Sequence, residues 1–401
     1  TAVILEVLTR LSEKTLLLAP TGKAAKRLSE ATKAEAKTIH RGLDFDAANY
    51  SFSRDEFNPI DEHNLIIDEA SMLDTDMAHA IFNATQKCKR VILIGDKDQL
   101  PSVGYGQILK DLIDSTLVNT SILTTIHRQK NKSGIIPGAH CINKHTIPDF
   151  NESDFQIIEC LDSDILKNIT DIIEREKAHY QLDDIMLLTP MRKNELGSIN
   201  INKHIKSILN PEKKNLNHSV TLRNRTFSVH DKVMQLRNNY DDFVFNGTTG
   251  TIDSVGIMED EEFVSVNYGT QKVIYTSNNI DEIEHAWAST IHKVQGSESP
   301  IVIIVVSPTH SFMHNKNLIY TAVTRAKKKC VFLGPKKTLE LGIKKVNANI
   351  RHTSLCNLLR RKNNLPLIEV NNIPSISKTT SVENNKSKNP FSNNINRKPF
   401  T

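Results

Sequence analysis

Short apolar runs alternate with amphipathic stretches along residues 1–120 of the chain. Strand-like runs occupy residues 15–19, 64–67 and 90–94, and each leads through a turn that contains Gly, Pro or Asp into a helical pattern. Strands separated by helices are typical of a parallel sheet with helical crossovers. Because ligands bind to such sheets beyond the carboxyl ends of the strands, we expect functional residues in the turns that follow these runs.

The same alternation returns further along the chain, with strand-like runs at residues 185–189, 302–306 and 330–333. The sequence therefore predicts an α/β protein with two parallel-sheet domains. The first domain is expected at residues 1–118, and the second at residues 119–216 and 281–362.

Between the two parts of the second domain the pattern changes. Residues 221–276 are rich in Val, Thr, Phe and Tyr in short alternations, and Asn246-Gly247 is a hairpin turn signal. We predict a small antiparallel barrel at residues 217–280, inserted into the second domain. Residues 363–401, rich in Asn, Ser, Lys and Pro, are expected to be a disordered tail.

Composition narrows the class of protein. A chain of 401 residues with 38% hydrophobic and 24% charged residues suits two or three globular domains. The apolar runs are strand-length, so no membrane span is expected, and no charged-then-apolar leader opens the chain. Five scattered cysteines without a Cys-x-x-Cys pair suit reduced thiols and a cytoplasmic location, and argue against a zinc site. A net charge of +5 permits a polyanionic partner.

The strand-like run in residues 65–71, LIIDEAS, ends in the adjacent carboxylates Asp68 and Glu69. At this position an Asp can hold Mg²⁺, and the Glu can take a proton from an attacking water. The alternative is a strand that ends in an acidic helix cap. The next strand-like run also leads into a polar loop, GDKDQLPSVG at residues 95–104, where Gln99 is placed to contact a terminal phosphate. Two such loops on neighbouring strands favour a nucleotide site over ordinary turns.

Seven segments together resemble, in order and spacing, the motifs of RecD-like superfamily 1 DNA helicases. They are residues 18–28 (motif Ia), 38–41 (the segment that follows it), 68–71 (motif II), 95–112 (motif III), 123–129 (motif IV), 289–298 (motif V) and 320–327 (motif VI). The resemblance covers about residues 16–361. It implies two RecA-like domains, an SH3-like barrel insertion, and the cofactors ATP and Mg²⁺.

By the same resemblance, the chain is expected to be the motor of an ATP-dependent DNA helicase, a single-strand translocase of 5′ to 3′ polarity. Single-stranded DNA and duplex DNA with a single-stranded tail would be its partners, beside other repair or recombination subunits. DNA repair, recombination or plasmid transfer would be the process. An RNA helicase of the same superfamily and a non-catalytic DNA-binding subunit are the alternatives.

The resemblance also implies a phosphate-binding loop, Gly-x-x-x-x-Gly-Lys-Ser/Thr, which should precede Thr1. Residues 21–23 are no substitute for it, because Ala24 stands where Ser or Thr is needed and Leu17 where the first Gly belongs. We therefore expect the chain to begin within the helix that follows this loop, and these 401 residues alone to hydrolyse little ATP.

Roles are carried over by resemblance, residue by residue. Asp68 would hold Mg²⁺ and nucleotide, with Gly296 and Glu298 on the nucleotide side of motif V. The expected catalytic residues are Glu69, Gln99, Arg128 and Arg325. The two arginines would be fingers from the second domain, since a guanidinium suits spread phosphoryl charge. The alternative for Arg325 is a helix-surface arginine.

DNA contacts are expected from both domains, through groups that suit sequence-independent phosphate binding. The expected contact residues are Pro20, Thr21, Thr38 and His40 in the first domain and Thr189, Pro190, Thr290 and His292 in the second. The two histidines could equally be packing or capping residues. A hairpin insertion at about residues 42–62, with Phe45, Tyr50 and Phe52, is either a strand-separating pin or an ordinary surface hairpin. Arg237, Asn238 and Asn239 of the barrel either help to close a DNA channel or are architectural.

Overall fold

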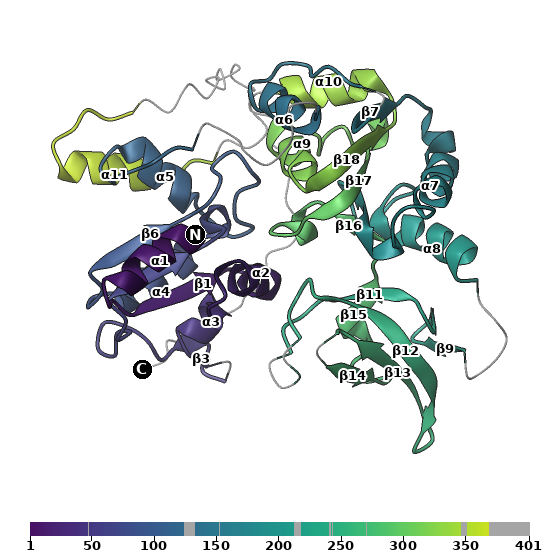
Figure 1. Cartoon of the computed structure of the whole chain (residues 1–401), viewed down its shortest axis with the longest axis horizontal. Helices are drawn as coiled ribbons and strands as arrows, with labels where there is room; N and C mark the ends of the chain where they lie inside the picture. The colour runs from purple at the N-terminus through teal and green to yellow at the C-terminus, as the bar shows by residue number, and fades with distance from the viewer. Residues whose placement is uncertain are drawn as a thin grey trace, which may run out of the picture.

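The structure, a computed structural model, has two α/β bodies side by side and a β-rich body below the second of them (Figure 1). The described residues are 1–46, 48–123, 133–151, 153–211, 218–239, 242, 244–269, 271–345 and 351–368. None of the helices in this described part is long and apolar enough to span a membrane.

The first sheet has four parallel strands in the order β2-β1-β5-β6. They are β1 (Thr15–Ala19), β2 (Ala36–Thr38), β5 (Asn64–Ile67) and β6 (Arg90–Leu93). All four residues of β5 are buried, so the strand that leads to Asp68 is fixed on both faces. The helices of this body are α1 (Ala2–Arg10), α2 (Gly22–Thr32), α3 (Ile39–Gly42), α4 (Thr75–Ala84) and α5 (Ile108–Ser115), and a hairpin pairs β3 (Phe45–Asp46) with β4 (Ser51–Phe52).

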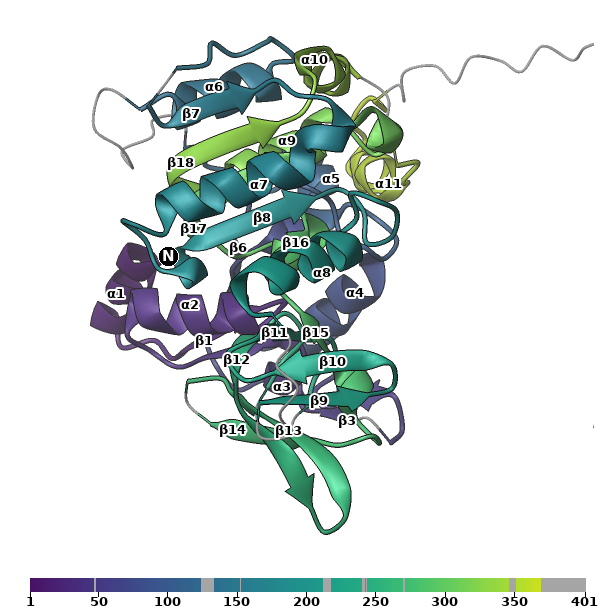
Figure 2. The same ribbon diagram turned by 90° about the vertical axis from the view of Figure 1, so that its right-hand side faces the viewer.

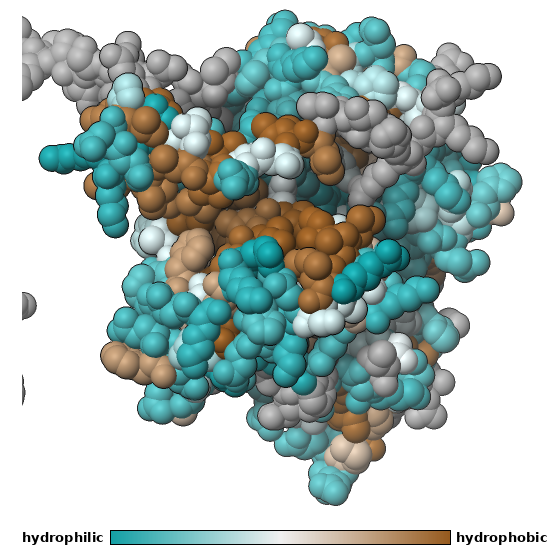
Figure 3. Space-filling view, turned by 60° about the vertical axis from the view of Figure 1, so that its left-hand side comes forward, coloured by the Kyte–Doolittle hydropathy of each residue, from teal (hydrophilic) through white to brown (hydrophobic). Residues whose placement is uncertain are grey.

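One side of the first body is apolar at its surface. The outward side of α1 exposes Val3, Val7 and Leu11, and apolar residues gather on this side of the molecule (Figure 3). Apolar surfaces of this kind are typical of places that another segment or protein covers.

The second sheet has five parallel strands in the order β16-β8-β17-β18-β7. They are β7 (Phe155–Ile158), β8 (Ile185–Thr189), β16 (Ala288–Thr290), β17 (Ser299–Val305) and β18 (Ala326–Leu333). Side chains alternate between the faces of a strand, so Val302 and Ile304 of the central β17 enter one core, and Ile301 and Ile303 enter the other.

Helices cover both faces of the second sheet. The first core packs against α6 (Ile135–Asn143), α9 (Lys316–Val323) and α10 (Lys336–Lys344), and the second against α7 (Asp162–Glu176) and α8 (Ser198–Leu209). Figure 2 shows α7 and α8 in front of the strands. The two predicted parallel-sheet α/β bodies are confirmed.

The third body is antiparallel and lies in the sequence between α8 and β16. Its strands are β9 (Ser219–Leu222), β10 (Arg225–Ser228), β11 (Lys232–Gln235), β12 (Thr249–Met258), β13 (Glu261–Asn267), β14 (Lys272–Tyr275) and β15 (Ile283–His285). Five of them form a sheet in the order β14-β13-β12-β11-β15, and β9 pairs with β10. One apolar core fills this body, in agreement with the predicted barrel.

Short 3-10 helices complete the described elements: η1 (Ala70–Met72), η2 (Leu182–Asp184), η3 (Ile280–Glu282), η4 (His292–Val294) and η5 (Pro308–His310). The last helix, α11 (Leu355–Lys362), lies beside α5 of the first body (Figure 1). The sequence pattern predicts this helix in the second domain, but in the structure Leu355 packs against the core of the first body. Of residues 363–401, predicted to be a disordered tail, the structure describes residues 363–368, and residues 369–401 lie outside the described residues.

Candidate active site

Asp68 and Glu69 lie at the carboxyl end of β5, in a turn held by both neighbouring strands. The Asp68 amide donates to the Leu18 carbonyl and the Ala70 amide to the Ile94 carbonyl. Glu69 has a left-handed backbone (φ 53°), and its amide donates to Oδ1 of Asp68 at 3.0 Å. A non-glycine residue in this conformation costs about 1 kcal/mol or more. The fold therefore maintains a strained turn at the point where the two carboxylates leave the sheet.

Burial raises the pKa of Glu69, while the nearby Arg325 charge acts in the opposite direction. A carboxylate with a raised pKa suits a proton acceptor near neutral pH. The Ser71 hydroxyl is buried nearby and has no hydrogen-bond partner among the described residues. Oxygen groups of this kind are the ligands that Mg²⁺ prefers, so the residues present fit a magnesium ion beside a nucleotide.

Gln99 follows β6 in the motif III loop and reaches the second body. Its Oε1 accepts a hydrogen bond from the guanidinium of Arg325 at 3.1 Å. The next residue is held in the same way, because the Leu100 amide donates to Oγ1 of Thr321 at 2.9 Å and its carbonyl accepts from Gln295 at 3.1 Å. This loop of the first body is therefore fixed by side chains of the second.

Arg325 follows α9 and is 3% exposed, so it is not a helix-surface arginine. Its guanidinium donates to the backbone carbonyls of Thr321 and Ser297, both at 3.1 Å. Burial lowers its pKa, and the charges of Glu69 and Glu298 oppose that shift. The structure thus brings together three of the four predicted catalytic residues. The fourth, Arg128 of motif IV, lies outside the described residues.

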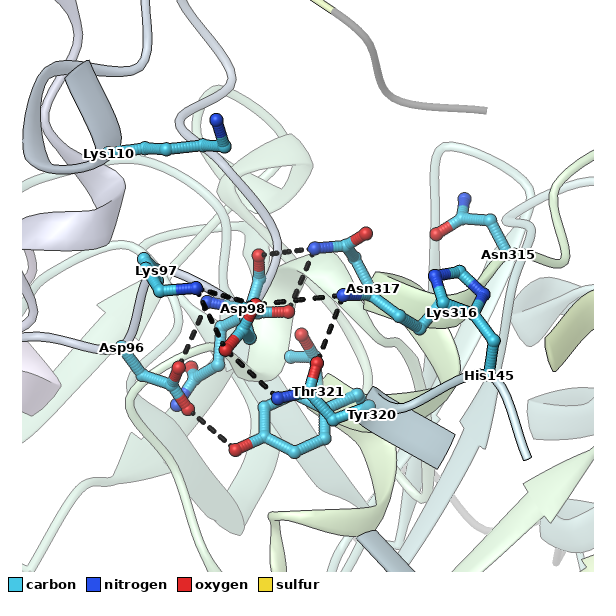
Figure 4. A network of polar contacts seen from close by, with 12 residues as sticks. Asp96, Lys97, Asp98, Lys110, His145, Asn315, Lys316, Asn317, Tyr320 and Thr321 are labelled. Carbon is cyan, nitrogen blue, oxygen red and sulfur yellow. Dashed lines mark hydrogen bonds and ion pairs between the residues drawn. The ribbon is translucent and has the colours of Figure 1, made fainter. Parts of the chain in front are cut away.

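A polar network that was not predicted links Asp96 and Asp98 of the motif III loop to side chains of α9 (Figure 4). The Tyr320 hydroxyl donates to the Asp96 carboxylate at 2.9 Å, and Asn317 donates to the Asp98 carbonyl at 2.8 Å. Burial and the neighbouring Asp96 raise the pKa of Tyr320, so it keeps its proton and donates.

Asp98 is the second carboxylate of this network. Burial alone would raise its pKa, but a hydrogen bond from Asn143 at 2.9 Å and the charges of Lys97 and Lys316 outweigh burial and lower it. Asp98 is therefore held as an anion. Its place in motif III was the available signal, but its partners on α6 and α9 cannot be read from the sequence.

Gly296 and Glu298 of motif V face α2 across the junction of the two bodies. Gly296 has φ +73°, and a Cβ there would lie 3.4 Å from the Ala24 Cβ and 3.9 Å from Oε1 of Glu69. Arg27 of α2 donates to the Gly296 carbonyl at 2.6 Å and pairs with Glu298 at 3.0 Å. Arg27, which the sequence analysis did not select, thus links motif Ia to motif V.

The predicted DNA residues of the first body have local structural partners. Thr21 accepts a hydrogen bond from the Ala24 amide and caps α2, and Thr38 caps α3 in the same way. The ring of His40 packs on Phe45 and Phe52 at centroid distances of 5.2 and 5.8 Å. Burial lowers the pKa of His40, which favours the neutral ring. Pro20 is half-buried beside them.

In the second body, the carboxyl ends of β8 and β16 pair in register at Thr189 and Thr290. Thr189 is fully buried, and its hydroxyl donates to the Leu196 carbonyl at 2.8 Å. In this arrangement it is not available to a phosphate. Pro190 is buried as well, whereas Thr290 and His292 are half-buried. Burial lowers the pKa of His292.

The loop between β11 and β12 extends from the barrel to both α/β bodies. A Cβ on Gly22 of α2 would come within 2.5 Å of the Phe245 side chain, and one on Gly247 within 3.7 Å of the Lys293 carbonyl. Close by, burial and the charges of Lys232 and Arg27 lower the pKa of Lys23 to about 8. The N-terminus of α2, motif V and the barrel loop therefore meet close to a cluster of cationic side chains, which includes Lys23, Arg27 and Lys232.

A cavity of about 620 Å³ lies elsewhere, between α8 and the barrel. Three of its cationic side chains are already engaged, because Arg192 pairs with Glu284, Lys206 with Asp231, and Arg225 with Asp281. We interpret it as a packing seam between the two bodies, and assign it no ligand.

Three families match parts of the chain. The matches are an AAA domain at residues 1–105, the ATP-dependent RecD-like DNA helicase SH3 domain at residues 201–268, and a UvrD-like helicase C-terminal domain at residues 285–333. They correspond to the first body, to the antiparallel body with α8, and to the motif V and VI region of the second body.

Curated relatives match over most of the chain. The ATP-dependent RecD2 DNA helicase of Deinococcus radiodurans is 30% identical over 344 residues, which are 86% of this chain and 46% of the relative. The RecBCD enzyme subunit RecD of Mycobacterium tuberculosis is 27% identical over 363 residues, covering 82% of this chain and 61% of the relative. The chain thus spans about half to three-fifths of the length of these relatives.

Among solved structures, a Bacteroides Pif1 helicase in complex with ADP-AlF3 and single-stranded DNA has a TM-score of 0.50 at 19% identity, covering 88% of each chain. This likeness concerns the fold. Together, the ordered motifs, the two parallel-sheet bodies, the RecD-type SH3 body and the relatives identify the chain as a member of the RecD-like superfamily 1 helicases.

Proposed function

We propose that the protein is an ATP-driven DNA helicase motor that moves along single-stranded DNA in the 5′ to 3′ direction. The observation that carries the proposal is the hydrogen bond between Gln99 and Arg325, with Glu69 close to the same guanidinium. Predicted catalytic groups from two separate bodies thus meet at the junction between those bodies. Such an arrangement can respond to a nucleotide by opening and closing, as a stepping motor requires.

At this junction, Asp68 would hold Mg²⁺, which when bound supplies positive charge against the phosphates. Glu69 would accept the proton of the attacking water, and Gln99 would contact the terminal phosphate. Arg325, with Arg128, would stabilise the transferring phosphoryl group. Gly296 and Glu298 would border the nucleotide, for which Glu298 would have to exchange its ion pair with Arg27.

For DNA, we propose a path along those predicted contact residues that are only half-buried, with the barrel loop around Phe245 closing over it. They are Pro20, Thr21 and His40 of the first body and Thr290 and His292 of the second. The cluster of Lys23, Lys26, Arg27 and Lys232 supports this path, because cationic side chains favour a phosphate backbone, although Arg27 and Lys232 would have to exchange their ion pairs with Glu298 and Asp183 for it. The partners would be single-stranded DNA and duplexes with a single-stranded tail. Since one relative is a subunit of a larger enzyme, we also propose other repair or recombination subunits as partners, and a cytoplasmic location.

The experiment is Arg325→Ala in the full-length protein. ATP binding should stay near that of the parent, while DNA-stimulated hydrolysis should fall by roughly three to five orders of magnitude, the range for arginine fingers. Arg325→Lys should rescue poorly, because an ammonium lacks the planar fork.

A matched control is Arg361→Ala, which removes an exposed arginine of α11. Because Arg325→Ala also removes hydrogen bonds to the backbone carbonyls of Thr321 and Ser297, thermal unfolding of each variant is measured beside the rates. A folded Arg325→Ala protein with near-parental hydrolysis would refute the proposed active site.

A further inference from the structure

Residues 351–362 follow the last helix of the second body in sequence, but they pack on the first body. Figures 1 and 2 both show α11 beside α5 and away from α8 and the barrel. The chain thus returns across the junction between the bodies after α10, whose Leu339 and Ile343 belong to the core of the second body. Several hydrogen bonds and one apolar contact attach this returning segment to the first body.

The first anchor is Arg351. Its guanidinium donates to three backbone carbonyls of one loop: Ser102 at 2.5 Å, Gly104 at 2.6 Å and Gly106 at 2.7 Å. It also donates to Oγ of Ser102 at 3.2 Å. A guanidinium offers five donors in one plane, which is the geometry that several carbonyls of a curved loop can use.

Further anchors lie along α5. The Thr353 hydroxyl donates to Oδ1 of Asp111 at 2.8 Å, and Asp111 is only 3% exposed. Beyond it, Leu355 packs against the core of the first body, and Arg360 donates to the Ser115 carbonyl at 3.1 Å. The segment is therefore attached from the loop before α5 to the end of that helix.

The loop that Arg351 holds depends on its backbone bonds. The side chains of Val103 and Tyr105 are 87% and 88% exposed, so their burial does not fix the loop. The Thr75 amide and hydroxyl donate to the Tyr105 carbonyl, and the Ser102 hydroxyl lies 3.1 and 3.3 Å from the Gly104 and Gly106 carbonyls. Arg351 donates to both of these glycine carbonyls, to the Ser102 carbonyl and to the Ser102 hydroxyl, so it ties the loop together. The same loop begins at Gln99 and Leu100, which the second body holds through Arg325 and Thr321.

We propose that residues 351–362 are an interdomain strap and that Arg351 is a positioning residue for the loop at residues 102–106. By fixing the far end of this loop, Arg351 keeps Gln99 in register with Arg325 while the two bodies move. The proposal that Arg351 fixes the loop rests only on the hydrogen bonds described above. Its consequence for hydrolysis rests on the proposed function.

The first test is hydrogen exchange on the full-length protein without nucleotide. Arg351→Ala should accelerate exchange of two amides that donate to this loop and its end, Thr75 to the Tyr105 carbonyl and Asp111 to the Gln107 carbonyl, by about tenfold or more, because the loop loses charge-assisted hydrogen bonds. Amides of β5 should not change, Arg351→Lys should give a smaller effect, and Arg361→Ala should match the parent. Unchanged exchange of the Thr75 and Asp111 amides would overturn the strap.

If Arg351→Ala accelerates exchange throughout the protein, the variant is destabilised as a whole, and Thr353→Val is measured in its place. Acceleration confined to residues 107–115 would then support the strap, and no acceleration would overturn it.

The second test measures ATP hydrolysis against DNA concentration. Arg351→Ala should lower the maximal DNA-stimulated rate at least severalfold and leave the basal rate and the half-saturating DNA concentration near those of the parent. A purely structural role would instead lower both rates with the folded fraction, and that result would contradict positioning. A parent protein that DNA does not stimulate would refute the proposed function, while the exchange result would still decide the strap.

Discussion

At the residue scale, Glu69 holds its carboxylate half-buried beside Asp68, and burial raises the pKa of this group. A carboxyl with a higher pKa in the folded than in the unfolded chain is more protonated when folded, so its ionisation destabilises the fold. The penalty is absent below the unfolded pKa, grows as the pH rises between the two values, and is complete above the folded value. At neutral pH, ionised Glu69 therefore lowers the free energy of unfolding.

We expect Glu69→Gln to raise the thermal midpoint of unfolding at neutral pH, and this gain to shrink as the pH falls through the raised pKa. The same change removes the proposed base, so turnover should drop by roughly two to four orders of magnitude. Thermal melts from acidic to neutral pH and ATPase rates of the full-length protein measure the two effects. Glu30→Gln, at an exposed glutamate, is the control. A variant that is less stable than the parent at neutral pH would contradict the assigned burial penalty.

The residues at strand ends were within reach of sequence reasoning. Asp68, Glu69 and Gln99 follow strand-like runs, and parallel strands bring their carboxyl ends to one edge. The ion pair between Arg27 and Glu298 could not be predicted from the sequence, because the two residues are 271 positions apart and meet only when the two bodies pack. The burial of Thr189 was equally out of reach, since it depends on the turn that brings the Leu196 carbonyl to its hydroxyl. Arg128 stays a prediction.

At the element scale, side chains on one face of α9 hold the motif III loop through hydrogen bonds. Thr321 accepts from the buried Leu100 amide, Asn317 donates to the Asp98 carbonyl, and Tyr320 donates to Asp96. Since Arg325 follows directly after α9, movement of this helix would shift the arginine and the loop together.

Thr321→Val tests the hydrogen bonding between α9 and the motif III loop. The substitution keeps the shape but leaves the Leu100 amide without its acceptor, which should cost about 1–3 kcal/mol in the free energy of unfolding. DNA-stimulated hydrolysis should fall more than this loss of stability explains, because Gln99 loses its support. Denaturant unfolding and ATPase rates are the measurements, with the exposed Thr146→Val as control. If stability falls and stimulation per folded molecule does not, α9 holds the fold without coupling the loop to hydrolysis.

Elements with an apolar period were predicted closely. The runs at residues 15–19 and 64–67 coincide with β1 and β5, because both are buried strands with clear turns after them. The outer end of β12 was not foreseen, since Ile257 and Met258 are exposed in a hairpin that projects from the barrel (Figures 1 and 2). The docking of α11 was also unforeseen, because an amphipathic pattern does not say which body a helix covers.

At the scale of the whole molecule, the three bodies meet around α2 and motif V. Arg27 joins α2 to Gly296 and Glu298, and Phe245 of the barrel packs on Gly22. Separation of the two α/β bodies would have to break the contacts of Arg27 with Gly296 and Glu298. We therefore expect ATP binding and DNA binding to influence each other through α2.

The central claim, an ATP-driven motor with 5′ to 3′ polarity on DNA, is tested most directly by strand separation with the full-length protein, ATP and Mg²⁺. Duplexes of one sequence are offered with a 5′ single-stranded tail, with a 3′ tail, with no tail, and with a 5′ RNA tail. We expect separation of the duplex with the 5′ DNA tail, loss of that activity in Arg325→Ala, and little separation of the other three. Equal separation from the 3′ tail would contradict the polarity, and separation that does not require ATP or Arg325 would contradict the motor itself.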